Sequence, residues 1–240
     1  MSGPVAIILA AGVGSRLRPL TDDRPKCLVP VGDETIVHRM VRLLAAQGVS
    51  RFVVSTGYLE GVLRDALMQA PRPVTFVSNP DYASTQNVVS LYRALAKLEP
   101  GEAFMKLDGD VLFDESVIAR ALAGDGDARV VVETSDALGH EEMKVLVDGG
   151  RVTRFGKGID PNRAHGESIG IEWFAADAAR RVKNAIDAAV NAGRTDVYYE
   201  DVYNDVLDAV VMRPVSVSST EWMEVDDAAD LERARERFGR

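Results

Sequence analysis

Short apolar runs alternate with amphipathic segments along the first half of the chain. The runs are continuous and end in glycine or polar residues, which is typical of strands buried on both faces of a parallel sheet. The amphipathic segments repeat apolar residues every three to four positions, which predicts helices. The expected strands cover residues 5–10, 51–55, 74–78 and 103–107, and the expected helices cover 35–47, 59–69 and 86–98.

The order of these elements predicts how the sheet is built. Strands that alternate with helices form βαβ units with parallel strands and right-handed crossovers. Ligands of such sheets bind beyond the carboxyl ends of the strands. Two polar turns fall at such ends: a glycine-rich loop after 5–10, and Asp108-Gly109-Asp110 after 103–107. Both turns are therefore candidates for a ligand site.

The second half of the chain has a different pattern. Asp148-Gly149-Gly150 lies between two strand-like segments and predicts a hairpin turn. Asp226 or Asp227 is placed to cap a terminal helix. The expected strands cover 129–133, 143–147, 151–155, 169–174 and 210–218, and the expected helices cover 175–192, 199–207 and 227–238. No linker-like stretch separates the halves, so we expect one α/β domain over 1–240 with a mostly parallel central sheet.

Composition narrows the classes of partner and compartment. The 240 residues carry a formal net charge of -9, which argues against non-specific nucleic-acid binding without excluding a local basic pocket. Cys27 is the only cysteine, so a disulfide framework within the chain is impossible. The apolar runs fall far short of the ~20 residues of a membrane helix, and the N-terminus lacks the basic start of a signal peptide. We expect a cytoplasmic protein with no membrane or nucleic-acid partner; a homodimer is compatible with the sequence.

The glycine-rich loop carries the most specific chemical signal. Gly12 and Gly14 would let backbone N–H groups approach phosphate oxygens, and Arg16 and Lys26 would supply positive charge. The GxGxxG dinucleotide pattern is not met, because Leu17 occupies the third glycine position, and the P-loop pattern is absent. Glycines alone would indicate only a tight turn. The added arginine and Pro-Lys pair favour a phosphate-binding loop.

Residues 9–26 as a whole resemble the signature of the nucleoside-triphosphate transferase family, which includes sugar-nucleotide pyrophosphorylases and cytidylyltransferases. The resemblance extends through Asp108-Gly109-Asp110 to Glu224-Val225-Asp226. It implies a nucleotidyltransferase with a Rossmann-like three-layer sandwich. Residues 1–115 would form the nucleotide-binding half, and 116–240 the acceptor-binding half with a small β-rich elaboration.

The resemblance also implies a Mg²⁺ cofactor held by Asp110 and Asp226. Attack on a triphosphate by an anionic acceptor needs a cation to offset the repulsion, and Mg²⁺ prefers carboxylate and phosphate oxygens. Asp108 would assist through a water or a hydroxyl group. Asp108 could instead be a simple turn residue, and Asp226 a helix cap. We expect Asp114 and Glu224 to be solvated or to lie behind the ligands.

The remaining nucleotide contacts follow from the same resemblance. Arg16 and Lys26 would clamp the triphosphate and act in catalysis with the two metal-binding aspartates. Leu9, Ala11 and Gly12 would flank the base, and Gln86 and Asn87 would read the base edge or the acceptor. The expected nucleotide-binding set is Leu9, Ala11, Gly12, Gly14, Ser15, Arg16, Lys26, Gln86, Asn87 and Asp108.

Residues 84–92, 167–171 and 196–201 resemble phosphocholine-type cytidylyltransferases. Lys157 stands where the family places a lysine that binds the acceptor phosphate, and Lys144 could reach the same anion. Aromatic side chains suit a quaternary ammonium and carboxylates suit a primary amine. Glu141 and Glu142 stand where choline-specific relatives carry an aromatic residue, which weakens the case for choline. The expected acceptor-binding set is Glu142, Lys144, Lys157, Glu167 and Tyr198.

The resulting hypothesis is a Mg²⁺-dependent cytidylyltransferase. It would transfer CMP from CTP to a small phosphate or phosphonate monoester, such as phosphocholine or 2-aminoethylphosphonate, and release pyrophosphate. A thymidylyl- or guanylyltransferase acting on a sugar 1-phosphate is one alternative, and a non-catalytic nucleotide-binding protein on the same fold is another. A dinucleotide-dependent oxidoreductase is disfavoured by the missing third glycine.

Overall fold

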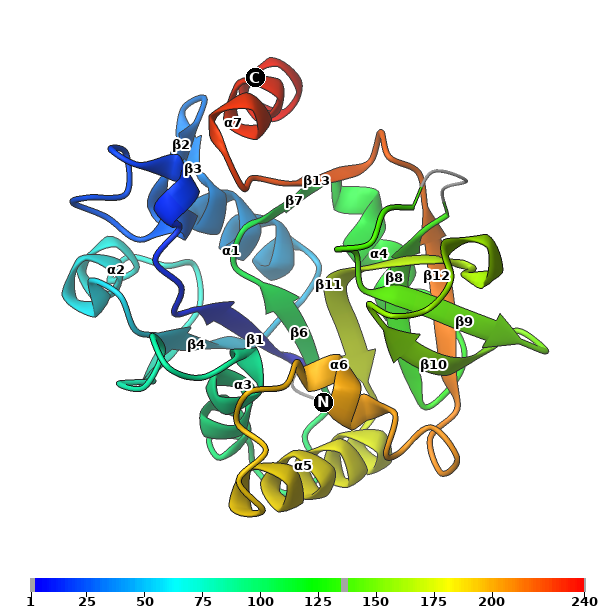
Figure 1. Ribbon diagram of the computed structural model, residues 1–240. Coiled ribbons are helices and arrows are strands. Elements are labelled where there is room, and N and C mark those ends of the chain that lie inside the picture. The colour runs from blue at the N-terminus through cyan, green and yellow to red at the C-terminus, as the bar shows by residue number, and fades with distance from the viewer. Residues whose placement is uncertain (1–2, 135–137, 240) are drawn as a thin grey trace.

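A nine-stranded sheet runs through the molecule (Figure 1). The computed structural model describes residues 3–134 and 138–239. Four strands from the first half are parallel, in the order β5-β4-β1-β6. They are β1 Val5–Ala10, β4 Arg51–Thr56, β5 Val74–Ser78 and β6 Phe104–Asp108. The prediction of a mixed α/β fold with a mostly parallel central sheet is confirmed.

Strand β11, Gly166–Phe174, connects this parallel set to the strands of the second half. It is antiparallel to β6 and also pairs with β8 and β9. The register of β11 against β8 shifts between Ser168 and Glu172, so the strand serves different neighbours along its length. The other strands here are β8 Ala128–Glu133, β9 Lys144–Asp148, β10 Arg151–Gly156 and β12 Met212–Val217.

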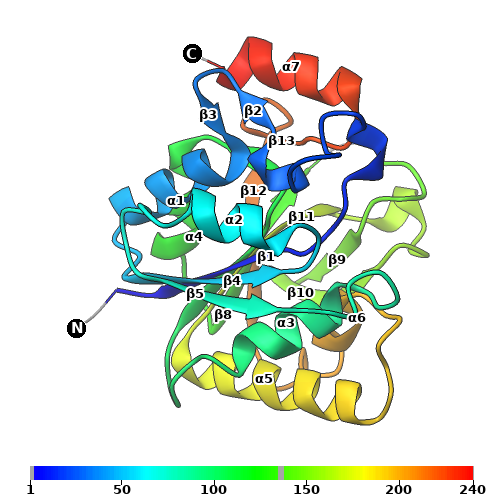
Figure 2. The ribbon, with the colours of Figure 1, turned by 90° about the vertical axis from the view of Figure 1, so that its left-hand side faces the viewer.

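Helices cover both faces of the sheet, as Figure 2 shows edge-on. Successive β1 side chains point to opposite faces, so Ile7 packs in one core and Ile8 in the other. The Ile7 side holds α3 Asn87–Leu95, α5 Ala176–Asn191 and α6 Tyr199–Tyr203. The Ile8 side holds α1 Ile36–Ala46, α2 Glu60–Ala66 and α4 Glu115–Ala123. Every helix in the described ranges is too short or too polar to span a membrane.

Short elements near the C-terminus bring distant segments together. Strand β13, Trp222–Glu224, pairs antiparallel with β7, Val111–Phe113. Helix α7, Ala228–Phe238, packs near the hairpin of β2 Pro30–Val31 and β3 Glu34–Thr35. Asp227 caps α7 by accepting hydrogen bonds from the Ala229 and Asp230 amides, so Asp226 is left for other contacts. The sequence pattern did not predict β7, β13, α4 or the hairpin of β2 and β3.

A substitution in an aromatic cluster tests how strongly packing at the β6–β11 pair contributes to the free energy of unfolding. The Phe174 ring is fully buried, stacks on Phe104 at 4.8 Å and meets Tyr203 edge-on at 5.3 Å. We expect Phe174→Ala to lower the free energy of unfolding by about 3–5 kcal/mol, because burial is lost and a cavity remains. Urea unfolding measures it. Met68→Ala, at a side chain 79% exposed, should change stability by less than about 0.5 kcal/mol; an equal effect would contradict the expectation.

Candidate active site

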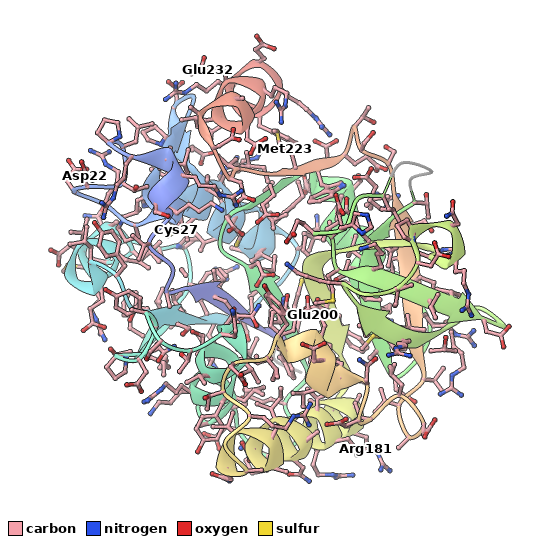
Figure 3. All side chains as sticks on the ribbon, in the orientation of Figure 1. Asp22, Cys27, Arg181, Glu200, Met223 and Glu232 are labelled. Carbon is pink, nitrogen blue, oxygen red and sulfur yellow. The ribbon has the colours of Figure 1, made fainter. Side chains whose placement is uncertain are left out.

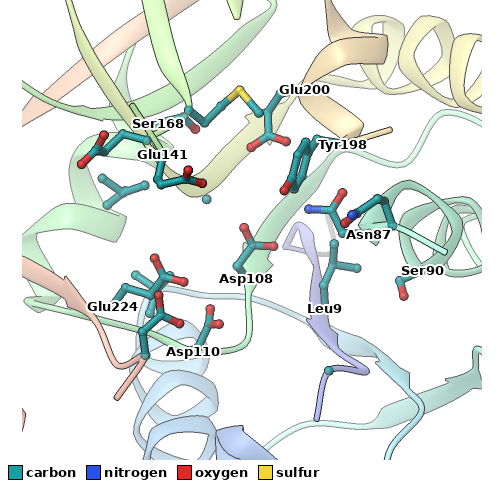
Figure 4. Close-up of a pocket in the computed structure, with 18 of the residues that line it drawn as sticks. Leu9, Asn87, Ser90, Asp108, Asp110, Glu141, Ser168, Tyr198, Glu200 and Glu224 are labelled. Carbon is teal, nitrogen blue, oxygen red and sulfur yellow. The ribbon is translucent and has the colours of Figure 1, made fainter. Parts of the chain in front are cut away.

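A cavity of about 920 Å³ opens beyond the carboxyl ends of β1 and β6 (Figure 4). Figure 4 shows Asp110 and Glu224 on one side, Glu200 and Tyr198 on the other, and Asp108 between them. Residues from both halves of the chain therefore line the cavity. Its lining includes Leu9, Ala11, Gly12, Arg16, Gln86, Asn87 and Asp108 of the expected nucleotide set, Glu142, Lys157, Glu167 and Tyr198 of the acceptor set, and Asp110 and Asp226.

Lys26 lies between the carboxylates at one end of this cavity. Its Nζ donates to Asp110 Oδ2 at 2.6 Å and to Asp226 Oδ1 at 2.6 Å, and lies 3.9 Å from Glu224 Oε1. Burial opposes a charge on Lys26, but the surrounding carboxylates outweigh burial and raise its pKa. The ammonium therefore joins three segments that are far apart in the sequence.

The glycine loop is shaped around Lys26. Gly14 has a left-handed backbone with φ +66°, and a Cβ there would lie 2.7 Å from Lys26 Cβ. Thr21 Oγ1 donates to the Gly14 carbonyl at 2.9 Å and closes the loop. Gly14 thus permits the lysine to pass beneath the loop. Gly14, Ser15 and Lys26 are not part of the cavity lining, whereas Gly12 lines it with open space at its Cβ position.

Arg16 lies at the rim of the cavity. Its side chain is 67% exposed, and its Nη2 lies 2.6 Å from Asp226 Oδ2. Asp226 therefore faces two cations, which lower its pKa although partial burial opposes them. An exposed guanidinium at this position is able to meet an anion that enters the cavity.

Three carboxylates at this end fit a hard divalent cation. Oxygens of Asp110, Glu224 and Asp226 all lie within 4.8 Å of one another. Mg²⁺ takes such oxygen ligands together with waters and phosphate oxygens. Glu224, which we had expected to be solvated or behind the ligands, is exposed and also belongs to this cluster. Partial desolvation and the neighbouring Asp110 raise the pKa of Glu224 to about 8. The alternation Glu-Val-Asp was the available signal, because residues two apart share one face of a strand.

Another lysine, Lys106, was not among the residues that the sequence predicted for the site. It is fully buried on β6, 3.0 Å from Glu172 Oε2 and 3.3 Å from Asp108 Oδ1. Tyr199 Oη donates to Asp108 Oδ2 at 2.6 Å. Asp108 is thus fixed in place, and it is more than a turn residue. A lysine inside an apolar strand was the signal, because a buried charge needs a partner.

Lys157 and Tyr198 form part of the opposite wall. Lys157 Nζ lies 4.6 Å from the centre of the Tyr198 ring and 3.7 Å from Glu141 Oε2. Glu167 lies on the same side; its burial and the nearby Glu133 and Glu142 raise its pKa to about 7. This wall therefore holds the half-buried ammonium of Lys157 among several acids.

Lys144, which the sequence analysis placed near an acceptor anion, is not part of the cavity lining. Lys144 is fully buried, and its Nζ donates to the carbonyls of His140, Glu142 and Lys157 at 3.3, 3.1 and 2.8 Å. Three acceptors satisfy the ammonium, so it is turned away from the cavity. Lys144 instead connects two loops that form the cavity wall.

The start of α3 is positioned by contacts that the sequence did not reveal. Asn87 Oδ1 accepts from the Tyr199 amide at 3.1 Å, which ties α3 to α6. Gln86 occupies the N-cap position without a capping side-chain hydrogen bond and faces the cavity. Thr85 donates to the Asp81 carbonyl at 2.9 Å, so it does not cap the helix. Gln86 and Asn87 therefore lie where a ligand in the cavity can meet them.

The chain is similar to known proteins over nearly its whole length. The chain is 29% identical over 229 residues to 2-aminoethylphosphonate cytidylyltransferase of Lancefieldella rimae, covering 94% of this chain and 89% of that protein. It is 26% identical over 232 residues to choline-phosphate cytidylyltransferase of Streptococcus pneumoniae, covering 96% of both. The inositol-1-phosphate CTP transferase from T. maritima has the same fold, with a TM-score of 0.82, 24% identity, and coverage of 100% of this chain and 96% of that one.

The family match itself covers residues 6–146, from β1 through most of β9. Its span includes the glycine loop, Lys26 and the Asp108–Asp110 turn, which are the parts of the cavity built by the first half. The chain belongs to the MobA-like NTP transferase domain family and is a nucleotidyltransferase, and the relatives named above are cytidylyltransferases.

Proposed function

We propose that this enzyme transfers CMP from CTP to a small phosphate or phosphonate monoester and releases pyrophosphate, with Mg²⁺ as cofactor. The observation that carries the proposal is the convergence of Lys26, Asp110, Glu224 and Asp226 at one end of a cavity whose other end holds Lys157. One end suits a metal-bound triphosphate and the other a short anionic acceptor.

In the proposed reaction, the nucleotide lies across the ends of β1 and β6. The cavity is open at Gly12, which leaves the backbone accessible to phosphate oxygens. Arg16 and Lys26 stabilise the negative charge that develops on the phosphates. Leu9 and Ala11 supply a small apolar surface for the base, and Gln86 supplies an amide for its edge.

The acceptor oxygen attacks the α-phosphorus directly. An oxygen of a phosphate or phosphonate monoester is ionised at neutral pH, so the residues of this chain need not remove a proton. Lys157 holds the acceptor anion, and Asp108 is fixed by Tyr199 near the centre of the cavity. Catalysis then consists of positioning and charge stabilisation.

Asp110 and Asp226, assisted by Glu224, would hold the Mg²⁺. When bound, the metal ion offsets the charge of the triphosphate and of the attacking oxygen. The three carboxylates are the donor set that favours it, and Lys26 keeps them close together in its absence.

Removal of one carboxylate tests the metal site. We expect Asp110→Ala to lower kcat/KM for Mg²⁺-dependent pyrophosphate release by about 1000-fold or more, because a metal ligand is lost. Asp114→Asn is the matched control, since this carboxyl precedes α4 and does not line the cavity. Near-native rates in Asp110→Ala, with an unchanged thermal transition, would contradict the assignment.

A panel of triphosphates tests the choice of nucleotide. With 2-aminoethylphosphonate, phosphocholine, inositol 1-phosphate and hexose 1-phosphates as acceptors, we expect pyrophosphate release with CTP to exceed that with UTP, dTTP and GTP by about tenfold or more. Chelation of divalent cations should abolish it, and added Mg²⁺ should restore it. Turnover confined to dTTP or GTP would replace the cytidylyl proposal.

Substitution of Lys144 tests what holds the cavity wall around Lys157 and Tyr198, the proposed acceptor wall, in position. We expect Lys144→Met to raise the KM for the acceptor about tenfold while the KM for CTP changes less than about twofold, because two wall loops lose their shared donor. Lys97→Met, at an exposed helix end, is the control. An equal rise in both KM values, or no change in either, would show that the lysine does not position the acceptor wall.

A further inference from the structure

Glu200 is an unusual side chain for the wall of a cavity. It is 4% exposed, and its Oε2 is buried without a hydrogen-bond partner among the described residues. Glu200 lies on α6 near the centre of the molecule (Figure 3), and its carboxylate is directed into the cavity beside Tyr198 (Figure 4). A buried carboxylate oxygen with no partner is costly, unless a ligand supplies the donor.

The charged groups behind Glu200 give it no ion pair among the described residues. Lys106 is the nearby buried cation, and it already contacts Glu172, Asp108, the Gly170 carbonyl and Tyr199 Oη. The ammonium of Lys106 therefore lies near three acids, namely Asp108, Glu172 and Glu200. Burial raises the pKa of Glu200 to about 8 even though Lys106 opposes the shift. A further cation in the cavity would restore the balance of charge.

The aromatic rings near this wall already carry cations from the protein itself. Lys157 Nζ lies over the Tyr198 ring at 4.6 Å, and Lys106 Nζ lies over the Tyr199 ring at 3.6 Å. A quaternary ammonium needs free aromatic faces and has no N–H to give. The vacant hydrogen-bond capacity of Glu200 favours a group that donates.

We propose that the acceptor carries a primary ammonium group and that Glu200 binds it, which makes Glu200 a residue that determines acceptor specificity. This inference rests on the proposed function, since it names the chemistry of the same acceptor. Asp108 lies between Glu200 and the Asp110–Glu224 side in Figure 4. A short amino-alkyl phosphonate or phosphate would thus place its ammonium at Glu200 and its anionic oxygen toward the metal-binding carboxylates, with Lys157 beside it.

The wild-type enzyme tests this proposal without any substitution. The probes form two pairs. The first pair is 2-aminoethylphosphonate and ethylphosphonate, which lacks the amine. The second pair is phosphoethanolamine and phosphocholine, which differ in methylation of the nitrogen. With CTP, we expect kcat/KM for 2-aminoethylphosphonate to exceed that for ethylphosphonate by about 100-fold, and phosphoethanolamine to exceed phosphocholine by at least about tenfold. Ratios within about threefold in either pair would overturn the proposal.

Glu200→Gln tests the residue itself, because glutamine keeps the shape and removes the charge. We expect kcat/KM for 2-aminoethylphosphonate to fall about 100-fold, while ethylphosphonate and the KM for CTP change less than about threefold. Asp208→Asn is the control, since it removes one charge from an exposed position shortly after α6. It should change neither the kcat/KM for 2-aminoethylphosphonate nor the KM for CTP. A loss of equal size for both acceptors would overturn the assignment to Glu200.

A binding measurement separates this proposal from the proposed function. In calorimetry with a non-hydrolysable CTP analogue and Mg²⁺ present, wild-type protein should bind 2-aminoethylphosphonate about 100-fold more tightly than ethylphosphonate, and Glu200→Gln should remove the difference. Turnover of phosphocholine, inositol 1-phosphate or a hexose phosphate in preference to the amines would overturn the ammonium site while leaving nucleotidyl transfer intact. Selective binding of the amine without pyrophosphate release from any triphosphate would overturn the proposed function and support the ammonium site.

Discussion

The contact of Lys26 with Asp110 and Asp226 is the interaction on which the site depends. The two hydrogen bonds of its Nζ join residues that are 84 and 200 positions away in the sequence. They fix the glycine loop, the turn after β6 and the strand before α7 to one point. Three carboxylates so close together repel one another, and one ammonium offsets only part of that repulsion. A triphosphate adds more negative charge, so a divalent cation is the natural complement of this arrangement.

Two lysines divide the cavity into two electrostatic parts. Asp108 and Asp110 are two residues apart, yet Asp108 contacts Lys106 and Tyr199, whereas Asp110 contacts Lys26. The turn between the two aspartates therefore separates the end of the cavity proposed for the nucleotide from the end proposed for the acceptor. Asp108 and Asp110 are thus held by different lysines, although they are only two residues apart.

Sequence reasoning predicted the regular elements of this fold well, because their signals are local. The bounds of β1 and β5 were predicted to the residue from continuous apolar runs bounded by turns. It did not find β7 and β13, which are three residues each and exist through pairing between segments about 110 positions apart. The same limit explains Lys106: its partner Glu172 lies opposite it in the β6–β11 register, and that register depends on the assembled sheet. Lys144 was assigned to the acceptor for a related reason, since strand alternation gives a face but not the carbonyls that surround an ammonium.

The end of the cavity proposed for the acceptor combines loops with the starts of α3 and α6, and buried side chains connect these parts. Lys144 binds three carbonyls from two wall segments, and Asn87 links the start of α3 to the amide of Tyr199 on α6. Such contacts are made by the protein alone, so the wall is formed before any acceptor enters. A preformed wall can select by charge, because a carboxylate such as Glu200 stays buried only if the rest of the wall keeps water and alternative partners away from it. Specificity at this end then resides in which buried groups the fold leaves without a partner, and that property emerges only from the packed structure.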